Sequence, residues 1–181
     1  MSGIIYQLNI GSGGVPKNPV DSARVTRECL EGDDWNWSIH KIQANNKPGG
    51  HGGPLQAICL YSLECLARLR GQGFPVFPGA LGENFTTQGI DYSQVRTGDT
   101  YQVGSVVQIR ITRLRRPCGT IRTVYSPGAR RGEGIELAMW DAQIKSGDTS
   151  SPKRGMSGFY AEVLVEGTVK KWDRIEKIIP C

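Results

Sequence analysis

The sequence predicts a single domain, 1–181, of mainly β structure with a few helices, an α+β fold. Three observations lead to this prediction. Short runs in which apolar and polar residues alternate recur along the chain. Glycine, at 24 residues, punctuates these runs, as it does in turns between strands. Only two segments carry apolar residues at helical spacing, and no linker-like stretch divides the 181 residues.

The first strands are expected at the N-terminus and in the middle of the chain. The run IIYQLNI (4–10) predicts a strand, and the glycine- and proline-rich segment 11–20 predicts a loop that contains Lys17. The run SVVQIRITRL (105–114) alternates cleanly, so one of its faces should be buried. The residues on that face are Val107, Ile109 and Ile111.

The C-terminal part predicts two further strands, and two segments predict helices. GFYAEVLVEGTVKKWDRI (158–175) contains two strands that meet at Gly167, and these strands could close a barrel. Ser62 can cap a helix that ends near Gly71, with an acidic first turn and a basic last turn. GIELAMWDAQIKSG (134–147) gives a weaker helical pattern.

Composition limits the functional classes. Hydrophobic residues make up 38% of the chain, and no apolar run approaches the roughly 20 residues of a membrane span. The N-terminus lacks the basic and apolar regions of a signal peptide, so we expect a soluble, cytoplasmic protein. The net charge of +5 favours an anionic partner. Scattered basic residues argue against nucleic acid as that partner.

The five cysteines form no C-x-x-C pair, and the chain has only two histidines. Structural zinc and a histidine-rich metal site therefore have little support. Any metal would be brought by a cofactor. We expect Cys59 and Cys65 to pack into the core near the first helix.

Cys118 has a different setting, in the stretch TRLRRPCGTIR (112–122). Cationic neighbours lower the pKa of a thiol, and the thiolate is the form that attacks electrophiles or binds metals. Alternatively, the arginines lie on a solvated strand face and Cys118 is a small residue in a turn. The surrounding arginines are Arg113, Arg115, Arg116 and Arg122.

Three other loops combine glycine with polar side chains. They are GGHGGPLQA (49–57), PGALGENF (78–85) and GGVPKNP (13–19). Such loops can bring backbone amides and directional side chains to a polar, anionic molecule. Each is equally typical of an ordinary turn, and none has the spacing of a nucleotide-binding motif.

In combination and in this order, the loops resemble the stand-alone MOSC domain proteins, named after the C-terminal domain of molybdenum cofactor sulfurase. The resemblance covers about 13–178 and includes HGGP, GEN and R-x-P-C. It implies a MOSC-type β-barrel that binds the molybdenum cofactor, a molybdenum pyranopterin dithiolene. The resemblance leaves binding of pyridoxal phosphate open.

The resemblance also implies roles for individual residues. Cys118 would be the protein's thiolate ligand to molybdenum, since soft thiolates suit such metals. His51 and Asn84 would be catalytic, positioning substrate or passing a proton. Glu83 either lines the cofactor cleft or only binds the amides of its own turn. The residues expected to bind the cofactor are Lys17, His51, Gly52, Glu83, Asn84, Arg113 and Arg115.

The activity that the resemblance implies is reduction of a small N-hydroxylated compound. Because the chain has no flavin fingerprint and no iron–sulfur cysteine set, electrons would come from a separate flavin or iron–sulfur protein. Two alternatives remain open. The protein could be a non-catalytic carrier of the cofactor or of sulfur on Cys118, or a cofactor-free barrel that binds another anion.

Parts of the chain depart from the family pattern. The segment 123–155 does not align, which leaves the substrate wall undefined. Glu162 stands in YAEVL where relatives have arginine, and this change removes a possible cofactor contact. Trp172 stands where relatives have glycine, which alters a turn.

Overall fold

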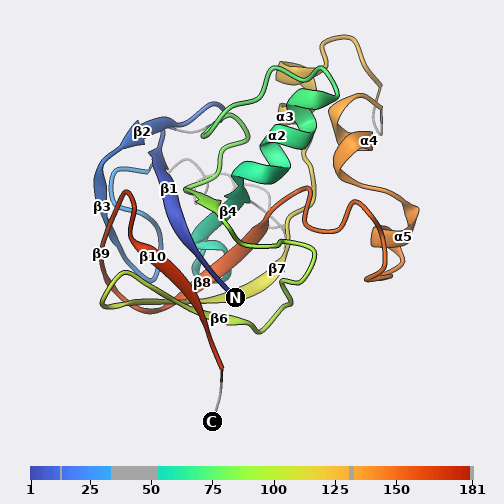
Figure 1. Ribbon diagram of the computed structural model, residues 1–181. Helices are drawn as coiled ribbons and strands as arrows, with labels where there is room; N and C mark the ends of the chain where they lie inside the picture. The colour runs from blue at the N-terminus through green and yellow to red at the C-terminus, as the bar shows by residue number, and fades with distance from the viewer. Residues whose placement is uncertain (13, 34–52, 131–132, 180–181) are drawn as a thin grey trace.

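The computed structural model describes residues 1–12, 14–33, 53–130 and 133–179, and its centre is a closed barrel of seven strands (Figure 1). Around the barrel the strand order is β1, β10, β6, β7, β8, β4 and β5, which returns to β1. Neighbouring strands are antiparallel except for β4 and β5. The predicted α+β, mainly β fold is confirmed. The strands are β1 (Ser2–Ile10), β4 (Ile58–Ser62), β5 (Phe85–Gln88), β6 (Thr100–Val103), β7 (Val107–Leu114), β8 (Phe159–Val165) and β10 (Arg174–Ile178).

Alternation in the sequence explains the inward and outward faces of β7. Val107 and Ile109 are fully buried and Ile111 is 2% exposed, as predicted. Two strands do meet at Gly167, but the second, β9 (Gly167–Lys170), does not continue the barrel. It pairs instead with β3 (Ser22–Val25) in a separate two-stranded sheet. A further short strand, β2 (Asn18–Val20), extends the barrel sheet beside β1.

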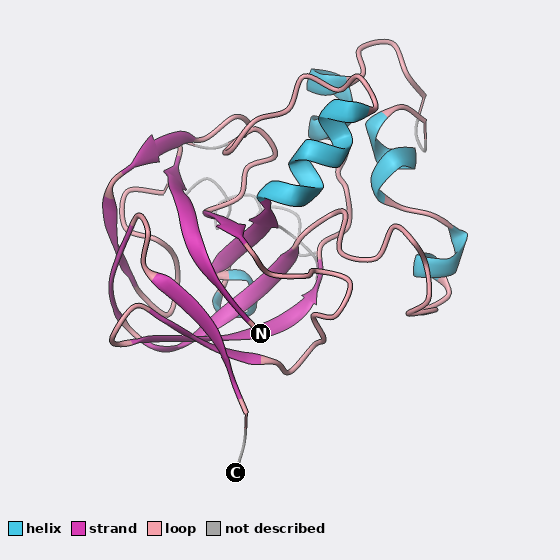
Figure 2. Cartoon of the chain, viewed as in Figure 1, coloured by secondary structure: helices cyan, strands magenta, loops and turns pink. Residues whose placement is uncertain are grey.

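The helices α2, α3, α4 and α5 gather on one side of the barrel (Figure 2), whereas η1 packs against β8. Ser62 caps α2 (Leu63–Gly71), where its hydroxyl accepts the backbone N–H of Cys65 at 3.2 Å. The segment predicted as one helix over 134–147 forms two short helices, α4 and α5. Extended backbone at Trp140 (φ −147°, ψ 140°) separates them, and Asp141 caps the second. The other short helices are η1 (Pro54–Gln56), α3 (Gly119–Tyr125), α4 (Ile135–Met139) and α5 (Ala142–Lys145).

Within the described ranges, the structure contains no helix that combines the length and the apolar character needed to cross a membrane.

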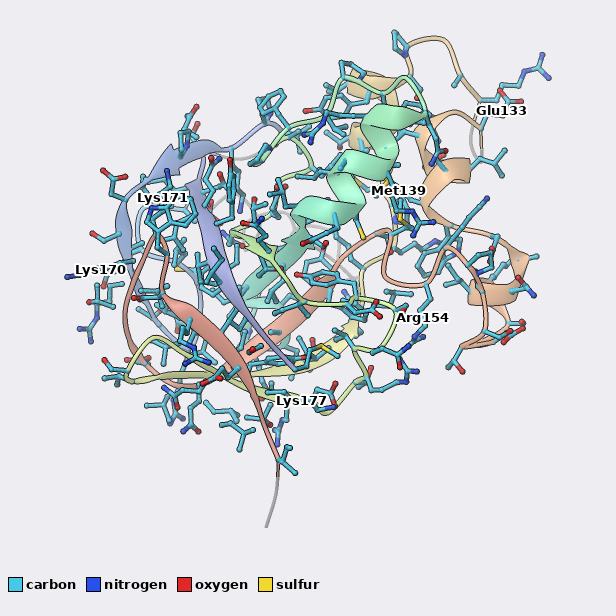
Figure 3. All side chains as sticks on the ribbon, viewed as in Figure 1. Glu133, Met139, Arg154, Lys170, Lys171 and Lys177 are labelled. Carbon is cyan, nitrogen blue, oxygen red and sulfur yellow. The ribbon has the colours of Figure 1, made fainter. Side chains whose placement is uncertain are left out.

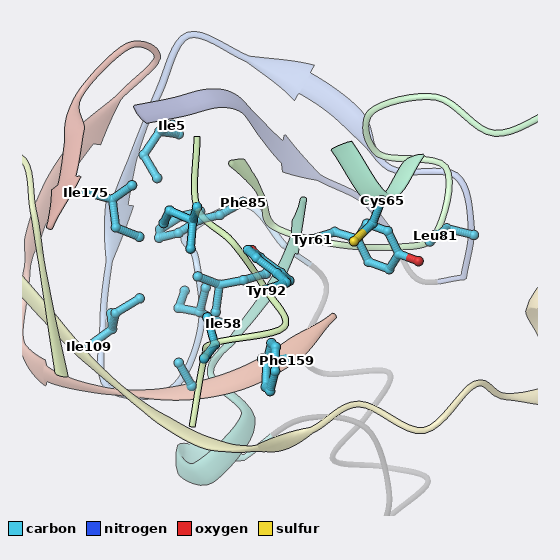
Figure 4. Close-up of a cluster of buried hydrophobic side chains, with 14 of the residues drawn as sticks. Ile5, Ile58, Tyr61, Cys65, Leu81, Phe85, Tyr92, Ile109, Phe159 and Ile175 are labelled. Carbon is cyan, nitrogen blue, oxygen red and sulfur yellow. The ribbon is translucent and has the colours of Figure 1, made fainter. Parts of the chain in front are cut away.

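The barrel interior is a packed hydrophobic core. Figure 4 shows side chains from β1, β4, β5, β7, β8 and β10 meeting inside the barrel. The cavity among Leu60, Tyr101, Phe159 and their neighbours has a volume of about 10 Å³, at most enough for one water molecule. This part of the core has no room for a ligand. The predicted site residues lie instead at strand ends and in the loops beside them.

The two single-residue departures from the family pattern, Glu162 and Trp172, have local explanations. Glu162 lies on β8 opposite Arg110 of β7, and its Oε1 accepts the Arg110 Nε–H at 2.8 Å. Trp172 occupies the turn between β9 and β10 with φ 75°, a conformation that usually favours glycine. Its indole packs edge-on against Tyr6, with ring centroids 5.5 Å apart. The substitution therefore gives the turn an aromatic contact with β1.

Candidate functional site

Cys118 lies just beyond the end of β7, at the residue that precedes α3. Its backbone is extended (φ −107°, ψ 165°), and the residue is partly buried against the edge of the core. The position keeps the thiol close to solvent while a rigid strand fixes where it lies. Cys118 is therefore the accessible thiol of this loop.

The four arginines near Cys118 have different surroundings. Arg113 is exposed, and its Cζ lies 5.4 Å from the centroid of the Tyr160 ring. Arg116 is exposed as well. Arg122 forms an ion pair with Glu136, Nη1 to Oε2 at 2.9 Å, so a carboxylate already balances its charge. Only Arg115 is buried, at 4% exposure.

Arg115 connects the Cys118 loop to the loop that contains Glu83. Its Nη2 donates to the Leu81 carbonyl at 2.5 Å, and its backbone N–H donates to the Gly158 carbonyl at 2.9 Å. Its Nε and Nη1 are buried without an acceptor among the described residues. Unsatisfied buried donors are costly, and a charged group raises that cost. Arg115 is therefore well suited to receive an anionic group.

Glu83 organises its own turn. Its Oε1 accepts the Gly79 N–H at 2.6 Å and the Thr86 hydroxyl at 2.9 Å, while Oε2 accepts the Leu81 N–H at 3.1 Å. Position 79 requires glycine for two reasons. Its φ is +90°, and a Cβ there would lie 2.5 Å from the Lys17 carbonyl oxygen. Burial raises the pKa of Glu83, although these hydrogen bonds oppose the change. The carboxyl group thus has the structural role that was one of its two predicted roles.

Asn84 links three segments through its side-chain amide. The Oδ1 accepts the Cys59 N–H at 3.0 Å, and Nδ2 donates to Asp33 Oδ2 at 2.8 Å. The same Asp33 oxygen lies 2.6 Å from Lys17 Nζ, and the other accepts the Gly11 N–H. Both members of this ion pair are mostly buried, at 11% and 16% side-chain exposure. Lys17 is therefore held close to Asn84 with its charge paired.

Cys59 brings a second thiol into this region. It lies on β4 at 5% exposure, and both its N–H and its carbonyl bond to Asn84. Burial raises its pKa, although Arg115 and Lys17 act in the opposite direction. Its burial, like that of Cys65, confirms the core placement predicted from the sequence.

Tyr160 connects the two thiols electrostatically. Burial raises its pKa to about 12, Arg115 opposes this increase, and the nearby Cys59 and Cys118 add to it. Arg115 likewise interacts with both cysteines. The end of β7, the start of β8 and the middle of β4 therefore share one cluster of titratable groups.

The structure brings together Lys17, Glu83, Asn84 and Arg115 through shared hydrogen-bond partners, and Cys118 joins them through Arg115. Arg113 lies at the edge, over Tyr160. His51 and Gly52 lie outside the described residues. Sequence reasoning did not select Asp33, Cys59 or Tyr160. The paired acids of EGDDW were a signal for Asp33, but alternating β residues gave none for the other two.

A groove elsewhere on the surface is separate from the predicted site residues. A groove of about 500 Å³ lies between α2 and α4 and contains none of the predicted site residues. Over the ranges that the structure describes, no three His, Cys, Asp or Glu side chains are grouped to hold a metal ion. The groove is lined by Arg68, Gln72, Phe74, Gly134, Leu137, Ala138, Pro152 and Lys153.

Comparison with known proteins gives one family. The MOSC domain family model matches residues 47–176. The uncharacterised protein YflK of Bacillus subtilis is 27% identical over 171 residues. These residues are 90% of this chain and 62% of YflK, so the chain spans less than two thirds of that relative.

Solved structures share the fold. YiiM from Geobacillus stearothermophilus aligns with a TM-score of 0.63 at 22% identity, over 98% of this chain and 75% of its own. YiiM from Escherichia coli aligns with a TM-score of 0.64 at 22% identity, over 99% and 71%. YuaD from Bacillus subtilis gives 0.65 at 18% identity, over 97% and 94%.

Proposed function

Because the chain belongs to the MOSC domain family, we propose that it binds the molybdenum cofactor through Cys118 and reduces small N-hydroxylated compounds. One observation supports this most strongly. A partly buried thiol at the end of β7 lies in the electrostatic field of a buried arginine that has two donors without acceptors among the described residues. A soft thiolate and a cationic hydrogen-bond donor are the two kinds of group that a metal-containing anion would use.

The residues present fit the molybdenum cofactor in donor chemistry. A soft thiolate is a suitable ligand for the metal, and its deprotonated form is the one that binds. The Nε and Nη1 groups of Arg115 can donate to phosphate oxygens, which arginine binds through paired hydrogen bonds. When bound, the cofactor would supply the two electrons that cleave an N–O bond.

The remaining residues hold this arrangement in place. Asn84 and Asp33 fix Lys17 near Cys59, and Glu83 fixes the turn whose Leu81 carbonyl accepts from Arg115. These contacts pre-organise the loops, so that ligand binding costs less ordering. His51 remains the predicted group for positioning the substrate or transferring a proton, whereas the buried Asn84 amide, bonded to Cys59 and Asp33, would act by holding the loops in place.

The reaction balances with two electrons and two protons. An N-hydroxylated compound would yield the corresponding N–H compound and water. The electrons would come from a separate flavin or iron–sulfur protein, in the cytoplasm. Substrate would approach from the exposed side of Cys118, where Arg113 and Arg116 extend into solvent.

The test is turnover by protein produced in a host that makes the molybdenum cofactor. Reduction of an aromatic amidoxime is followed with a reduced viologen dye as electron donor. We expect the wild-type protein to form the amidine and Cys118→Ala to lose this activity. Cys59→Ala is the matched control, since it removes a thiol beside the same arginine, and should retain activity.

The outcomes distinguish the proposed functions. Equal turnover by wild-type protein and Cys118→Ala would contradict the reductase mechanism. Full molybdenum content without turnover of any N-hydroxylated compound would favour the carrier function. Salt-sensitive anion binding by a protein that never acquires molybdenum would favour a cofactor-free barrel.

A further inference from the structure

Two arginines that take no part in the proposed function converge on one backbone oxygen. Arg96 Nη1 donates to the Val95 carbonyl at 3.1 Å, and Arg154 Nη2 donates to the same oxygen at 3.0 Å. Because both nitrogens lie about 3 Å from one atom, they lie within about 6 Å of each other. Figure 3 shows Arg154 at the side of the barrel, on the chain between α5 and β8. Two guanidinium groups this close repel one another.

Asp99 is an acidic residue that contacts the backbone of Arg96, but its carboxylate does not pair with either guanidinium group. Its Oδ1 lies 2.6 Å from Lys177 Nζ, and its Oδ2 accepts the backbone N–H of Arg96 at 2.9 Å. Neither guanidinium forms an ion pair with any described carboxylate. The cluster therefore has an uncompensated positive charge.

Arg154 also has unused donors. Its Nε is buried and has no acceptor among the described residues. Its Nη1, like Nη2 of Arg96, donates to no described residue. Burial, together with Arg96, lowers the pKa of Arg154.

Close backbone packing fixes the two arginines relative to each other. Gly155, the next residue after Arg154, has φ +81°, and a Cβ there would lie 2.6 Å from the Tyr92 carbonyl oxygen. The Arg96 guanidinium is anchored a second time, through the Ser93 carbonyl at 2.6 Å. The 91–96 loop and the chain before β8 are thus in direct contact, and the positive pair is pre-formed.

We infer that Arg96 and Arg154 form a binding site for a phosphate group, separate from the cofactor site. A phosphate accepts several hydrogen bonds at once and carries the negative charge that the pair lacks. The partly buried setting strengthens both effects compared with an exposed pair. The phosphate would be either inorganic phosphate or the phosphate of a small ester.

The test titrates inorganic phosphate into the protein, at constant ionic strength, by calorimetry. We expect saturable binding with a Kd of about 1 mM or below, weakened at least about tenfold by Arg154→Gln and by Arg96→Gln. Arg110→Gln is the matched control, because it removes an equal charge at an exposed site on β7. The same titrations in an Arg115→Met background remove any phosphate bound at the cofactor site, and the weakening by Arg154→Gln and Arg96→Gln should persist there.

Further titrations identify the ligand. Glycerol phosphate that binds more tightly than inorganic phosphate would assign the site to a phosphate ester, and the reverse order would assign it to the free ion. If Arg154→Gln does not fold, Arg154→Lys keeps the charge, loses the planar fork and should still weaken binding. Phosphate affinity unchanged in both single variants, or acetate bound as well as phosphate, would overturn the inference.

Discussion

Cys59 and Cys118 interact with the same arginine but have opposite surroundings. Cys59 lies within β4, where both its backbone groups are bonded and its side chain is buried. Cys118 follows β7, partly exposed at the start of α3. Arg115 and Lys17 favour a thiolate at Cys59, yet burial outweighs them and raises its pKa.

The difference teaches that a cationic neighbour alone does not make a cysteine reactive. Desolvation penalises the charged form, and at Cys59 this penalty exceeds the Coulombic gain. Cys118 has the cation and keeps access to solvent. The contrast supports Cys118, rather than Cys59, as the proposed thiolate ligand, while Cys59 is buried in the barrel wall.

Apart from removal of the Cys118 thiol itself, the largest expected effect comes from the arginine that the two cysteines share. Arg115→Met should lower molybdenum content at least about tenfold, which corresponds to about 1.4 kcal/mol of binding energy. Without its donor, the Leu81 carbonyl loses a hydrogen bond, so the cofactor-free protein should lose about 1–3 kcal/mol of unfolding free energy. Metal analysis and urea unfolding measure the two effects.

The neighbouring arginine supplies the control for this prediction. Arg116→Met removes the same charge from an exposed position, and we expect little change in either measurement. If both variants lose molybdenum equally, general positive charge rather than the buried guanidinium holds the cofactor.

Alkylation compares the two thiols directly. In cofactor-free protein at pH 8, iodoacetamide should modify Cys118 at least about tenfold faster than Cys59, because reaction needs an accessible thiolate. Peptide mass spectrometry separates the sites. Equal alkylation rates of Cys118 and Cys59 in the folded protein would contradict the proposed difference in their accessibility and reactivity.

The buried thiols should also make stability fall at alkaline pH. Burial raises the pKa of Cys65 from 9.0 to about 11. Between these values the unfolded chain has lost a proton that the folded chain retains, so the folded state becomes less stable as pH rises. The contribution of Cys65 amounts to about 2.7 kcal/mol at most.

Unfolding free energies at pH 8, 9, 10 and 11 test this dependence. Cys65→Ala should flatten the decline, and Cys59→Ala should act in the same direction. A decline identical to that of the wild-type protein in both variants would show that neither thiol carries it.

The smallest expected effect comes from Ser62, at the junction between strand β4 and helix α2. Ser62→Ala removes the cap of α2, three residues after Cys59, and should cost about 1 kcal/mol of unfolding free energy. Molybdenum content should not change. A loss of metal in this variant would mean that β4 contributes to the cofactor site beyond its packing.

Sequence reasoning reached the strands and the first helix because their signals are local. Alternation in β7 and the Ser62 cap depend on neighbouring residues only. The two helices over 134–147 were predicted as one, since the apolar spacing does not reveal the extended backbone at Trp140. The pairing of β9 with β3 is a long-range contact that no local pattern encodes.

Sequence motifs predicted some of the candidate site residues. Residues that reach the site only through tertiary packing could not be predicted in this way. The glycine-rich loops indicated Lys17, Glu83 and Asn84, and the arginine-rich stretch 112–122 indicated Cys118. Asp33 is recognised as part of the candidate site only from the fold, which places it in contact with Lys17 and Asn84. The run RLRRPC likewise does not show that one arginine is buried and its neighbour exposed.

The most direct test of the central claim is the molybdenum and pterin content of wild-type protein, Cys118→Ser and Cys59→Ser, all produced in a host that makes the cofactor. Cys118 as the ligand predicts metal and pterin near one per chain in wild-type protein and Cys59→Ser, and almost none in folded Cys118→Ser. Equal loss in both variants, or retention in Cys118→Ser, would contradict this assignment.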